Sequence, residues 1–518
     1  MKGMASLKKQ ISYVIGSFLA GFSVMTVELV SSRIVAPIIG SSVFTWTSVI
    51  GITLAGLSIG SWLGGKLADR AKHAEILPLS FLASSVLVSV IPVLSKHTDF
   101  ITGASDSMLG LNLFISLYLF LLPALSIGLI QPLILKKYAT DFSTIGSRYG
   151  LLSAVWSAGS LIGVFMTGFF FISHIGSGAT IWLTAAILFL TGLCFAFSQK
   201  KTLNFFLIAA IIVPLALWSF KRNEYAEKNV VFHGETDYYD AKVVDTYLSS
   251  LGESRILFLD FDSHSVDTDE VSPYLYTEMY PAFRDIKPGI KSILAIGAGA
   301  YTMPEHFKEY YKDADVSVIE TDPEIEQIGK DYFKLGDYDI KTTVGDARLV
   351  LKRDPKKYDV IFGDAYNSFI SVPWYLLTKE WNDVAREKLT DGGMYAINFI
   401  GSLEGENSRF ALAVLNTFRK SFPNFYAFTF GASPGDAQNI VFIGVKGDLP
   451  MSESALKEKL AQGRNGFLAD RLAPAALFDN DQSLILTDDF SPVEKLMAPM
   501  MKEYFPKNLS FMKEISNS

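Results

Sequence analysis

The chain has 518 residues, enough for more than one domain, and its 49% hydrophobic content is unevenly distributed. Residues 1–220 carry 13 Lys/Arg and 6 Asp/Glu, whereas the remainder carries 33 and 47, so an apolar half precedes an acidic one. An acidic domain lacks the clustered cations that bind phosphate backbones, which argues against a nucleic-acid partner. The single cysteine excludes an internal disulfide and a cysteine-based metal site.

Seven apolar runs in the first half are long enough to span a bilayer. They cover residues 11–30, 44–65, 76–94, 111–135, 150–172, 179–197 and 203–220. Small residues recur at close spacing in the second run, which is typical of tightly packed membrane helices. No cleavage site follows the basic first ten residues, so the first run indicates an uncleaved anchor. We therefore predict a multi-pass α-helical membrane domain over residues 1–220, with the lipid bilayer as a partner.

Glu28 lies deep in the first run, where an ionisable group is costly. Two interpretations stay open: a polar site inside the bundle, or an ion pair with Arg33 that fixes helix packing. Lys and Arg gather in the segments that would be cytoplasmic if the N-terminus is inside. Seven spans would then place the acidic half outside, whereas nucleoside cofactors are made inside, so the side of the cell membrane on which it lies stays open.

Residues 291–322 have the pattern of a strand, a glycine turn, a helix, a second strand and an acid. Gly297 and Gly299 follow a short apolar run and allow the backbone to turn sharply beside a ligand. Glu320 ends the second strand about 20 residues later, where nucleotide-binding sheets place a carboxylate for the ribose hydroxyls. The pattern predicts a nucleoside site. The alternative is an ordinary strand-to-helix turn with a solvated Glu320.

Two more acids follow later strands, Asp346 after residues 340–344 and Asp364 after residues 360–362. Because ligands bind at the carboxyl ends of parallel strands, we expect these acids to converge with Glu320. Asp346 would accept a hydrogen bond from an adenine amino group, and Asp364 would take a proton from an incoming amine. Helix N-capping is the alternative for both.

Strands that alternate with helices indicate a mainly parallel sheet. We predict an α/β Rossmann-like domain of the class I methyltransferase type over residues 291–518. A linker and a small N-terminal β-subdomain would occupy residues 221–290, and an antiparallel edge would lie near residues 426–430 and 440–445.

Several motifs, in this order and spacing, resemble those of the spermidine synthase family, the polyamine aminopropyltransferases: ETDYYDAKVV, AIGAGAYT, VIETD, GDA and FGDAYNS. The resemblance runs from residue 235 to residue 398 and suggests a membrane-fused member. It implies transfer of a propylamine-type group from decarboxylated S-adenosylmethionine to an amine such as putrescine. Methylthioadenosine would be released, and no metal would be needed.

The resemblance also assigns roles to single residues. Asp364 would be the catalytic base. The nucleoside would contact Gly297, Gly299, Glu320, Asp346 and Ala347. The amine substrate would contact Tyr239, His264, Tyr276 and Asn367.

The departures from the family pattern fall on residues that choose substrates. Ala300 stands where the family has an acid in the glycine motif, and Asn367 stands where it has the second acid of the catalytic loop. Thr277 replaces the histidine of the family's Y-H-E-M motif. Each lost carboxylate removes a charge-assisted hydrogen bond worth roughly 1.5–3 kcal/mol. Ala300 also removes a charge that would repel the carboxylate of intact S-adenosylmethionine. Asp488 and Asp489 would supply replacement acids if the C-terminal segment folds over the pocket.

Two alternative functions therefore stay open. One is an enzyme that acts on intact S-adenosylmethionine, by methyl transfer or by a cleavage that releases methylthioadenosine. The other is a non-catalytic sensor of nucleosides or polyamines coupled to the membrane bundle. The oligomeric state, a homo-oligomer included, is also open.

Overall fold

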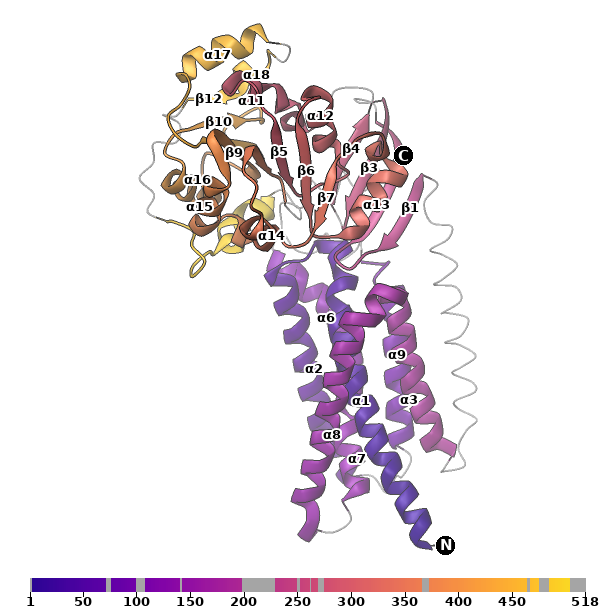
Figure 1. The fold of residues 1–518 in the computed structure, drawn as a ribbon. Helices are drawn as coiled ribbons and strands as arrows, with labels where there is room; N and C mark the ends of the chain where they lie inside the picture. The colour runs from indigo at the N-terminus through magenta and orange to yellow at the C-terminus, as the bar shows by residue number, and fades with distance from the viewer. Residues whose placement is uncertain are drawn as a thin grey trace. The chain divides into compact units, whose positions relative to one another are not determined.

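The computed structural model describes residues 2–70, 76–98, 108–139, 142–197, 229–248, 252–260, 262–268, 274–365, 372–463, 466–474 and 484–503. The chain divides into two compact units, Met1–Lys228 and Asn229–Ser518 (Figure 1). The described elements of the first unit are all helices, and those of the second are strands and helices. The predicted seventh apolar run and Asn367 lie outside the described residues.

Five stretches among the described residues are long and apolar enough to cross a membrane: Lys9–Ile39, Val43–Arg70, Ile76–Leu94, Leu109–Tyr138 and Ile145–Phe197. They are formed by α1 (Lys2–Ile39), α2 (Val43–Arg70), α3 (Ile76–Ser89), α4 (Ile91–Leu94), α6 (Met108–Gly128), α7 (Ile130–Tyr138), α8 (Ile145–Met166), a π-helical turn (Thr167–Phe171) and α9 (Ile172–Phe197). The fifth stretch contains both the fifth and the sixth predicted run. Gly176, with φ 76° and ψ 167°, breaks the helical geometry between these two runs.

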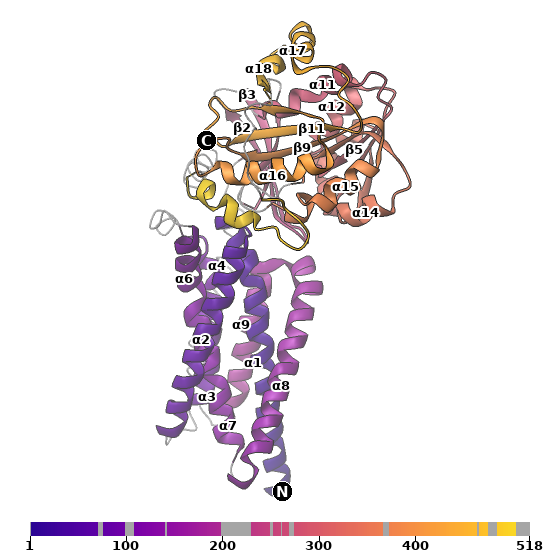
Figure 2. The same cartoon turned by 90° about the vertical axis from the view of Figure 1, so that its left-hand side faces the viewer.

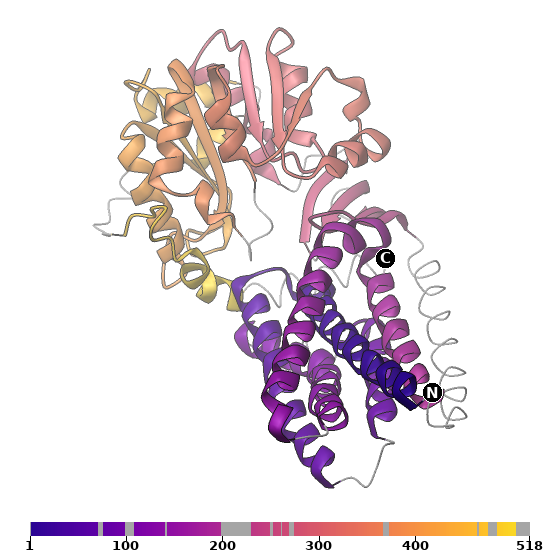
Figure 3. The ribbon, with the colours of Figure 1, turned by 60° about the horizontal axis from the view of Figure 1, so that its bottom comes forward.

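Small residues let the helices of this unit approach closely, as their spacing predicts. A Cβ atom on Gly60 of α2 would lie 2.1 Å from the carbonyl oxygen of Leu125 in α6. A Cβ atom on Gly159 of α8 would lie 2.0 Å from the carbonyl oxygen of Phe18 in α1. The helices are gathered side by side in one bundle (Figure 2 and Figure 3). Glu28 of α1 is half-buried, and its Oε2 atom has no hydrogen-bond partner among the described residues.

The second unit contains two sheets. The smaller is antiparallel and has the strand order β1 (Val230–Glu235), β2 (Asp240–Leu248), β3 (Gly252–Leu259), β4 (Asp262–Thr268). The larger has the order β12-β10-β11-β9-β8-β5-β6-β7. Its strands are β5 (Ser292–Ile296), β6 (Asp315–Glu320), β7 (Lys341–Val344), β8 (Tyr358–Gly363), β9 (Leu389–Gly401), β10 (Phe425–Thr429), β11 (Gln438–Val445) and β12 (Leu472–Ala473). Its helices are α11 (Tyr280–Ile286), α12 (Thr302–Tyr310), α13 (Pro323–Tyr332), α14 (Ala347–Arg353), α15 (Lys379–Glu387), α16 (Ser408–Ser421), α17 (Glu453–Gln462) and α18 (Leu468–Arg471).

The order of the strands in the larger sheet creates a crevice. The strands β9-β8-β5-β6-β7 are parallel, and β11, β10 and β12 extend the sheet as an antiparallel edge on β9. From β5 the chain builds β6 and β7 on one side, and then returns to build β8 and β9 on the other. Ligands of such sheets bind where the order reverses, outside the carboxyl ends of β5 and β8. The predicted Rossmann-like domain with a small β-sheet before it is therefore confirmed.

Apolar side chains cover both faces of the larger sheet. Strand β8 is buried along its whole length, as expected for a central parallel strand. On one face, Phe362 packs edge-to-face against Phe283 and Phe307. On the same face, Ala295 of β5, which pairs with Phe362, and Val318 of β6 share a cluster with the small sheet. Members of this cluster from the small sheet include Ala241, Val243, Leu257 and Leu259. This cluster fixes the small sheet beside the turn that follows β5.

Candidate active site

The turn after β5 carries the two glycines that the sequence singles out. Gly297 and Gly299 have φ values of 84° and 51°, in the left-handed region that favours glycine. A Cβ atom on Gly297 would lie 2.6 Å from the carbonyl oxygen of Asp364, and one on Gly299 would lie 2.6 Å from Ser265 Oγ. Any larger residue would push the turn away from β8 on one side and from β4 on the other. The glycines therefore bring three segments together at the crevice.

Glu320 is the last residue of β6 and lies at the crevice. It is 8% exposed, and it accepts hydrogen bonds from three backbone N–H groups: Ala298 at 2.9 Å to Oε2, and Thr321 at 2.7 Å and Asp322 at 3.0 Å to Oε1. Burial raises the pKa of Glu320, and these three donors lower it in part. A carboxylate has about four acceptor positions, so Oε2 keeps one for a further hydroxyl group.

Asp364 follows β8 and is partly buried at the crevice. Its Oδ2 accepts a hydrogen bond from the Tyr276 hydroxyl at 2.9 Å, and its Oδ1 accepts one from Asn398 Nδ2 at 2.8 Å. Burial raises the pKa of Asp364 to about 6, although the hydrogen bonds from Asn398 and Tyr276 lower it. A carboxylate with this pKa is mostly ionised at neutral pH and can still accept and release a proton there.

A cavity of about 550 Å³ joins these groups. Most of the site residues predicted from the sequence line it: Tyr239, His264, Tyr276, Gly297, Gly299, Glu320, Ala347 and Asp364. Asp346 is not among the lining residues. Its Oδ1 accepts a hydrogen bond from the backbone N–H of Leu349 at 2.9 Å and caps α14, which is the alternative role considered for it. Its contact with an adenine stays a prediction.

The structure adds residues to the site that the sequence analysis missed. Asn398, at the end of the neighbouring strand β9, orients Asp364, and its own Oδ1 accepts a hydrogen bond from Asn439 Nδ2 at 3.1 Å. The parallel register pairs Gly363 with Ile397, which sets Asp364 beside Asn398. The sequence could have predicted this contact, because Asn398 is a polar residue toward the carboxyl end of the strand next to β8.

The expectation that Asp488 replaces a missing acid is wrong. Its carboxylate forms an ion pair with Arg348 of α14 and accepts a hydrogen bond from the Thr378 hydroxyl at 2.8 Å. Neither Asp488 nor Asp489 lines the cavity. The segment around Asp488 therefore fastens α14 to α15 rather than covering the crevice.

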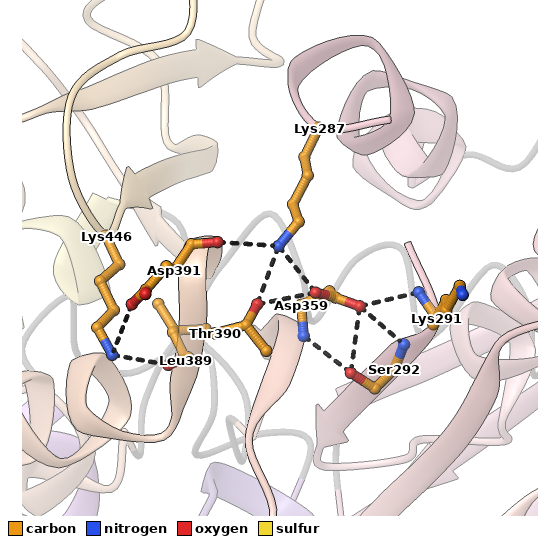
Figure 4. Close-up of polar contacts among 8 residues, drawn as sticks. All are labelled: Lys287, Lys291, Ser292, Asp359, Leu389, Thr390, Asp391 and Lys446. Atoms are coloured by element: carbon orange, nitrogen blue, oxygen red, sulfur yellow. Dashed lines mark hydrogen bonds and ion pairs between the residues drawn. The ribbon is translucent and has the colours of Figure 1, made fainter. Parts of the chain in front are cut away.

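Asp359, near the start of β8, shows how an ion pair lowers the pKa of an aspartate at the opposite end of the strand from Asp364. Asp359 Oδ1 lies 2.8 Å from Lys287 Nζ, and its Oδ2 accepts hydrogen bonds from the backbone N–H groups of Lys291 and Ser292 at 2.9 and 3.2 Å (Figure 4). Burial raises the pKa of Asp359, but the hydrogen bonds from Lys287, Lys291 and Thr390 outweigh it and hold this pKa at about 2. Asp359 is therefore a fixed charge that ties the start of β8 to its neighbours.

Comparison with known proteins identifies relatives of the second unit. A polyamine aminopropyltransferase of Vibrio vulnificus is 28% identical over 238 residues, which are 43% of this chain and 75% of that protein. A probable polyamine aminopropyl transferase of Bifidobacterium longum is 28% identical over 204 residues, 39% of this chain and 44% of that protein. These relatives support a transferase of the spermidine synthase family. No family model matches it. Among solved structures, a probable spermidine synthase of Corynebacterium glutamicum aligns with a TM-score of 0.38 and 20% identity, and covers 49% of this chain and 98% of that one.

Two positions at which this member departs from the spermidine synthase family pattern now have visible surroundings. Ala300 is fully buried, and its backbone N–H donates a hydrogen bond to Ser265 Oγ at 2.8 Å. Thr277 donates its hydroxyl hydrogen to the carbonyl oxygen of Tyr274 at 2.9 Å. Neither side chain carries a charge into the cavity, so a charged ligand group must find its partner elsewhere along the wall.

Proposed function

We propose that the second unit transfers a propylamine-type group from decarboxylated S-adenosylmethionine to an amine such as putrescine, with release of methylthioadenosine. The observation that carries the proposal is Asp364, a partly buried carboxylate with a pKa of about 6, held by two donors at the reversal point of the sheet. The relatives named above support the reaction class.

The other residues of the cavity would hold the substrates around this base. A ribose hydroxyl would donate to the remaining acceptor position of Glu320 Oε2, and the adenosine would lie over the glycine turn, with Ala347 beside its adenine ring. The amine would approach from the side of Tyr276, with Tyr239 and His264 in the same wall and Asn367 as its further predicted contact. The described residues among these line one cavity, which supports the proposed roles.

The chemistry that this arrangement allows is a single displacement. The amine nitrogen forms a bond to the propyl carbon beside the sulfonium, while the bond from that carbon to sulfur breaks and sulfur keeps the electron pair. The proton of the amine passes to Asp364, and the carboxylate offsets the positive charge that develops on nitrogen. Tyr276 and Asn398 keep the carboxylate aimed at the cavity.

A second candidate function is a reaction on intact S-adenosylmethionine. Ala300 favours it, because intact S-adenosylmethionine carries a carboxylate on its tail. The buried methyl group of Ala300 does not repel this carboxylate, whereas an acid at this position would. The helical unit has five stretches that could cross a bilayer, and we propose that it anchors the transferase in the cell membrane.

The test is to incubate the full-length chain, purified in detergent, with each sulfonium donor, with and without putrescine, and to identify the products by mass spectrometry. We expect methylthioadenosine and a longer polyamine from the decarboxylated donor. S-adenosylhomocysteine would instead indicate methyl transfer, and the absence of product from both donors would contradict a transferase. Asp364→Asn should lower kcat by about 10²–10⁴-fold. Asp313→Asn, at an exposed position outside the cavity, should leave kcat unchanged.

A further inference from the structure

Glu305 is a buried acid of the cavity that the proposed mechanism does not use. It lies in the first turn of α12, shortly after the glycine motif, and lines the cavity. It is 7% exposed, and its Oε1 atom is shielded from solvent with no hydrogen-bond partner among the described residues. A buried carboxylate oxygen without a donor is costly, so this position suits an incoming hydrogen-bond donor.

The cavity wall around Glu305 is acidic. Asp267, Glu278 and Glu309 line the same cavity, with Lys334 as the nearby cation. Lys334 Nζ is 3.2 Å from Asp267 Oδ1, and its side chain is 58% exposed. Glu309 accepts a hydrogen bond from the Tyr338 hydroxyl. Even without a charge on Glu305, three carboxylates against one lysine give this end of the cavity a negative potential that attracts cations.

The electrostatics of Glu305 follow from these neighbours. Its pKa is raised to about 8, mainly by burial; Asp267, Glu309 and Asp337 contribute to the rise, and Lys334 opposes it. At neutral pH the carboxyl group therefore holds a proton when no ligand is bound. A cation that arrives beside it favours the charged form, so binding should release that proton.

We propose that this acidic end of the cavity binds a primary ammonium group of a ligand, with Glu305 as its principal partner. An ammonium group has three N–H donors and needs an acceptor inside an apolar wall, which Glu305 Oε1 offers. A metal ion would need several ligands at once, and the described residues contain no cluster of three that could hold one. The inference rests on the proposed function in one respect: the ammonium belongs either to the propylamine tail of the donor or to the far end of a diamine acceptor.

Two matched pairs of ligands distinguish these sources, each measured by calorimetric titration of the full-length chain in detergent. Decarboxylated S-adenosylmethionine is compared with methylthioadenosine, which lacks the amine. Putrescine is compared with butylamine, which lacks the second ammonium group. In Glu305→Gln we expect at least a tenfold loss of affinity for the ammonium-bearing member of one pair and no loss for its match. Equal losses for both members, or no loss in either pair, would overturn the proposal.

Proton release gives a second readout that does not depend on turnover. Titrations at pH 7 in two buffers of different ionisation enthalpy should show a proton released on binding by the wild-type chain and none by Glu305→Gln. Gln reproduces the neutral, protonated form of the side chain, so the variant should fold, and an unchanged unfolding midpoint would verify this. Glu387→Gln, at an exposed position of α15, is the control and should behave as wild type. If no amine yields methylthioadenosine but the ammonium-specific loss persists, the proposed function fails and this site stands.

Discussion

The contact between Tyr276 and Asp364 leads to the sharpest prediction, because it concerns a pKa rather than only a loss of activity. The Tyr276 hydroxyl donates to Asp364 Oδ2 at 2.9 Å, and burial raises the pKa of the tyrosine well above 10, so it stays a donor. A hydrogen bond to a charged acceptor is worth about 1.5–3 kcal/mol, and one pKa unit corresponds to 1.36 kcal/mol. Tyr276→Phe should therefore raise the pKa of Asp364 from about 6 to about 7–8.

The sign and the size of this change can be read from a pH profile. If the ionised carboxylate is the base, as proposed, kcat/KM should fall as the pH drops below about 6 in the wild-type enzyme and below about 7–8 in Tyr276→Phe. At pH 7 the ionised fraction would decrease from about 90% to about 50% or less. The assay is methylthioadenosine release between pH 5 and pH 9 at low donor concentration.

The neighbouring tyrosine supplies the control for this experiment. Tyr274 donates its hydroxyl hydrogen to the carbonyl oxygen of Ser263 at 3.1 Å and makes no contact with Asp364 among the hydrogen bonds of the described residues. Tyr274→Phe should keep the acidic limb of the profile near pH 6. An unmoved limb in Tyr276→Phe, or a limb displaced to lower pH, would refute the assignment of Asp364 as the base that this hydrogen bond tunes.

Two further predictions concern the framework of the site. Gly297→Ala should weaken methylthioadenosine binding at least tenfold in equilibrium dialysis and lower the free energy of unfolding by about 1–3 kcal/mol, because a methyl group on this left-handed backbone would lie 2.6 Å from the carbonyl oxygen of Asp364. Gly336→Ala, with open space around its Cβ position, is the control and should change neither quantity. Unaffected binding in Gly297→Ala would contradict the predicted nucleoside position. Lys287→Met should lower stability by about 2–4 kcal/mol at pH 7 in chemical denaturation, because it leaves Asp359 charged without its cation. The pKa of Asp359 is held at about 2, so its ion pair stabilises the fold above pH 4 and is lost as the pH falls toward 2. The loss of unfolding free energy in Lys287→Met should therefore shrink as the pH approaches 2. The exposed control Lys312→Met should lose no unfolding free energy at any pH.

The sequence predicted the parts of the site that depend on strand ends. Glu320 and Asp364 are visible in advance because a parallel sheet aligns the carboxyl ends of its strands, and an acid that follows an apolar run must lie at that edge. The glycine turn is visible because only glycine tolerates both the left-handed backbone and the contact with Asp364. These features follow from local pattern together with one topological rule.

The parts that the sequence did not predict depend on contacts between distant segments. Asp346 follows a strand in the same way as Glu320, but its side chain turns back to cap α14. Asp488 is drawn to Arg348, which is 140 residues away in the chain. Glu305 has the helical spacing of an ordinary surface acid, and only the packing of α12 beside β4 buries it. No spacing rule separates these outcomes, because each is decided by the partner that the fold supplies.

Strand β8 shows why the partner matters more than the residue type. Asp359 is its second residue, Asp364 follows its last residue, and burial acts to raise the pKa of both. At Asp359 a lysine and several N–H donors more than offset this cost, and the pKa is held at about 2. At Asp364 the two donors are neutral and no cation is among its pKa determinants, so the offset is incomplete and the pKa stays at about 6. A cation beside Asp364 would make it as inert a base as Asp359. The reactivity of the site therefore requires that positive charge reach Asp364 only with the substrate, which is the condition that an amine nucleophile fulfils.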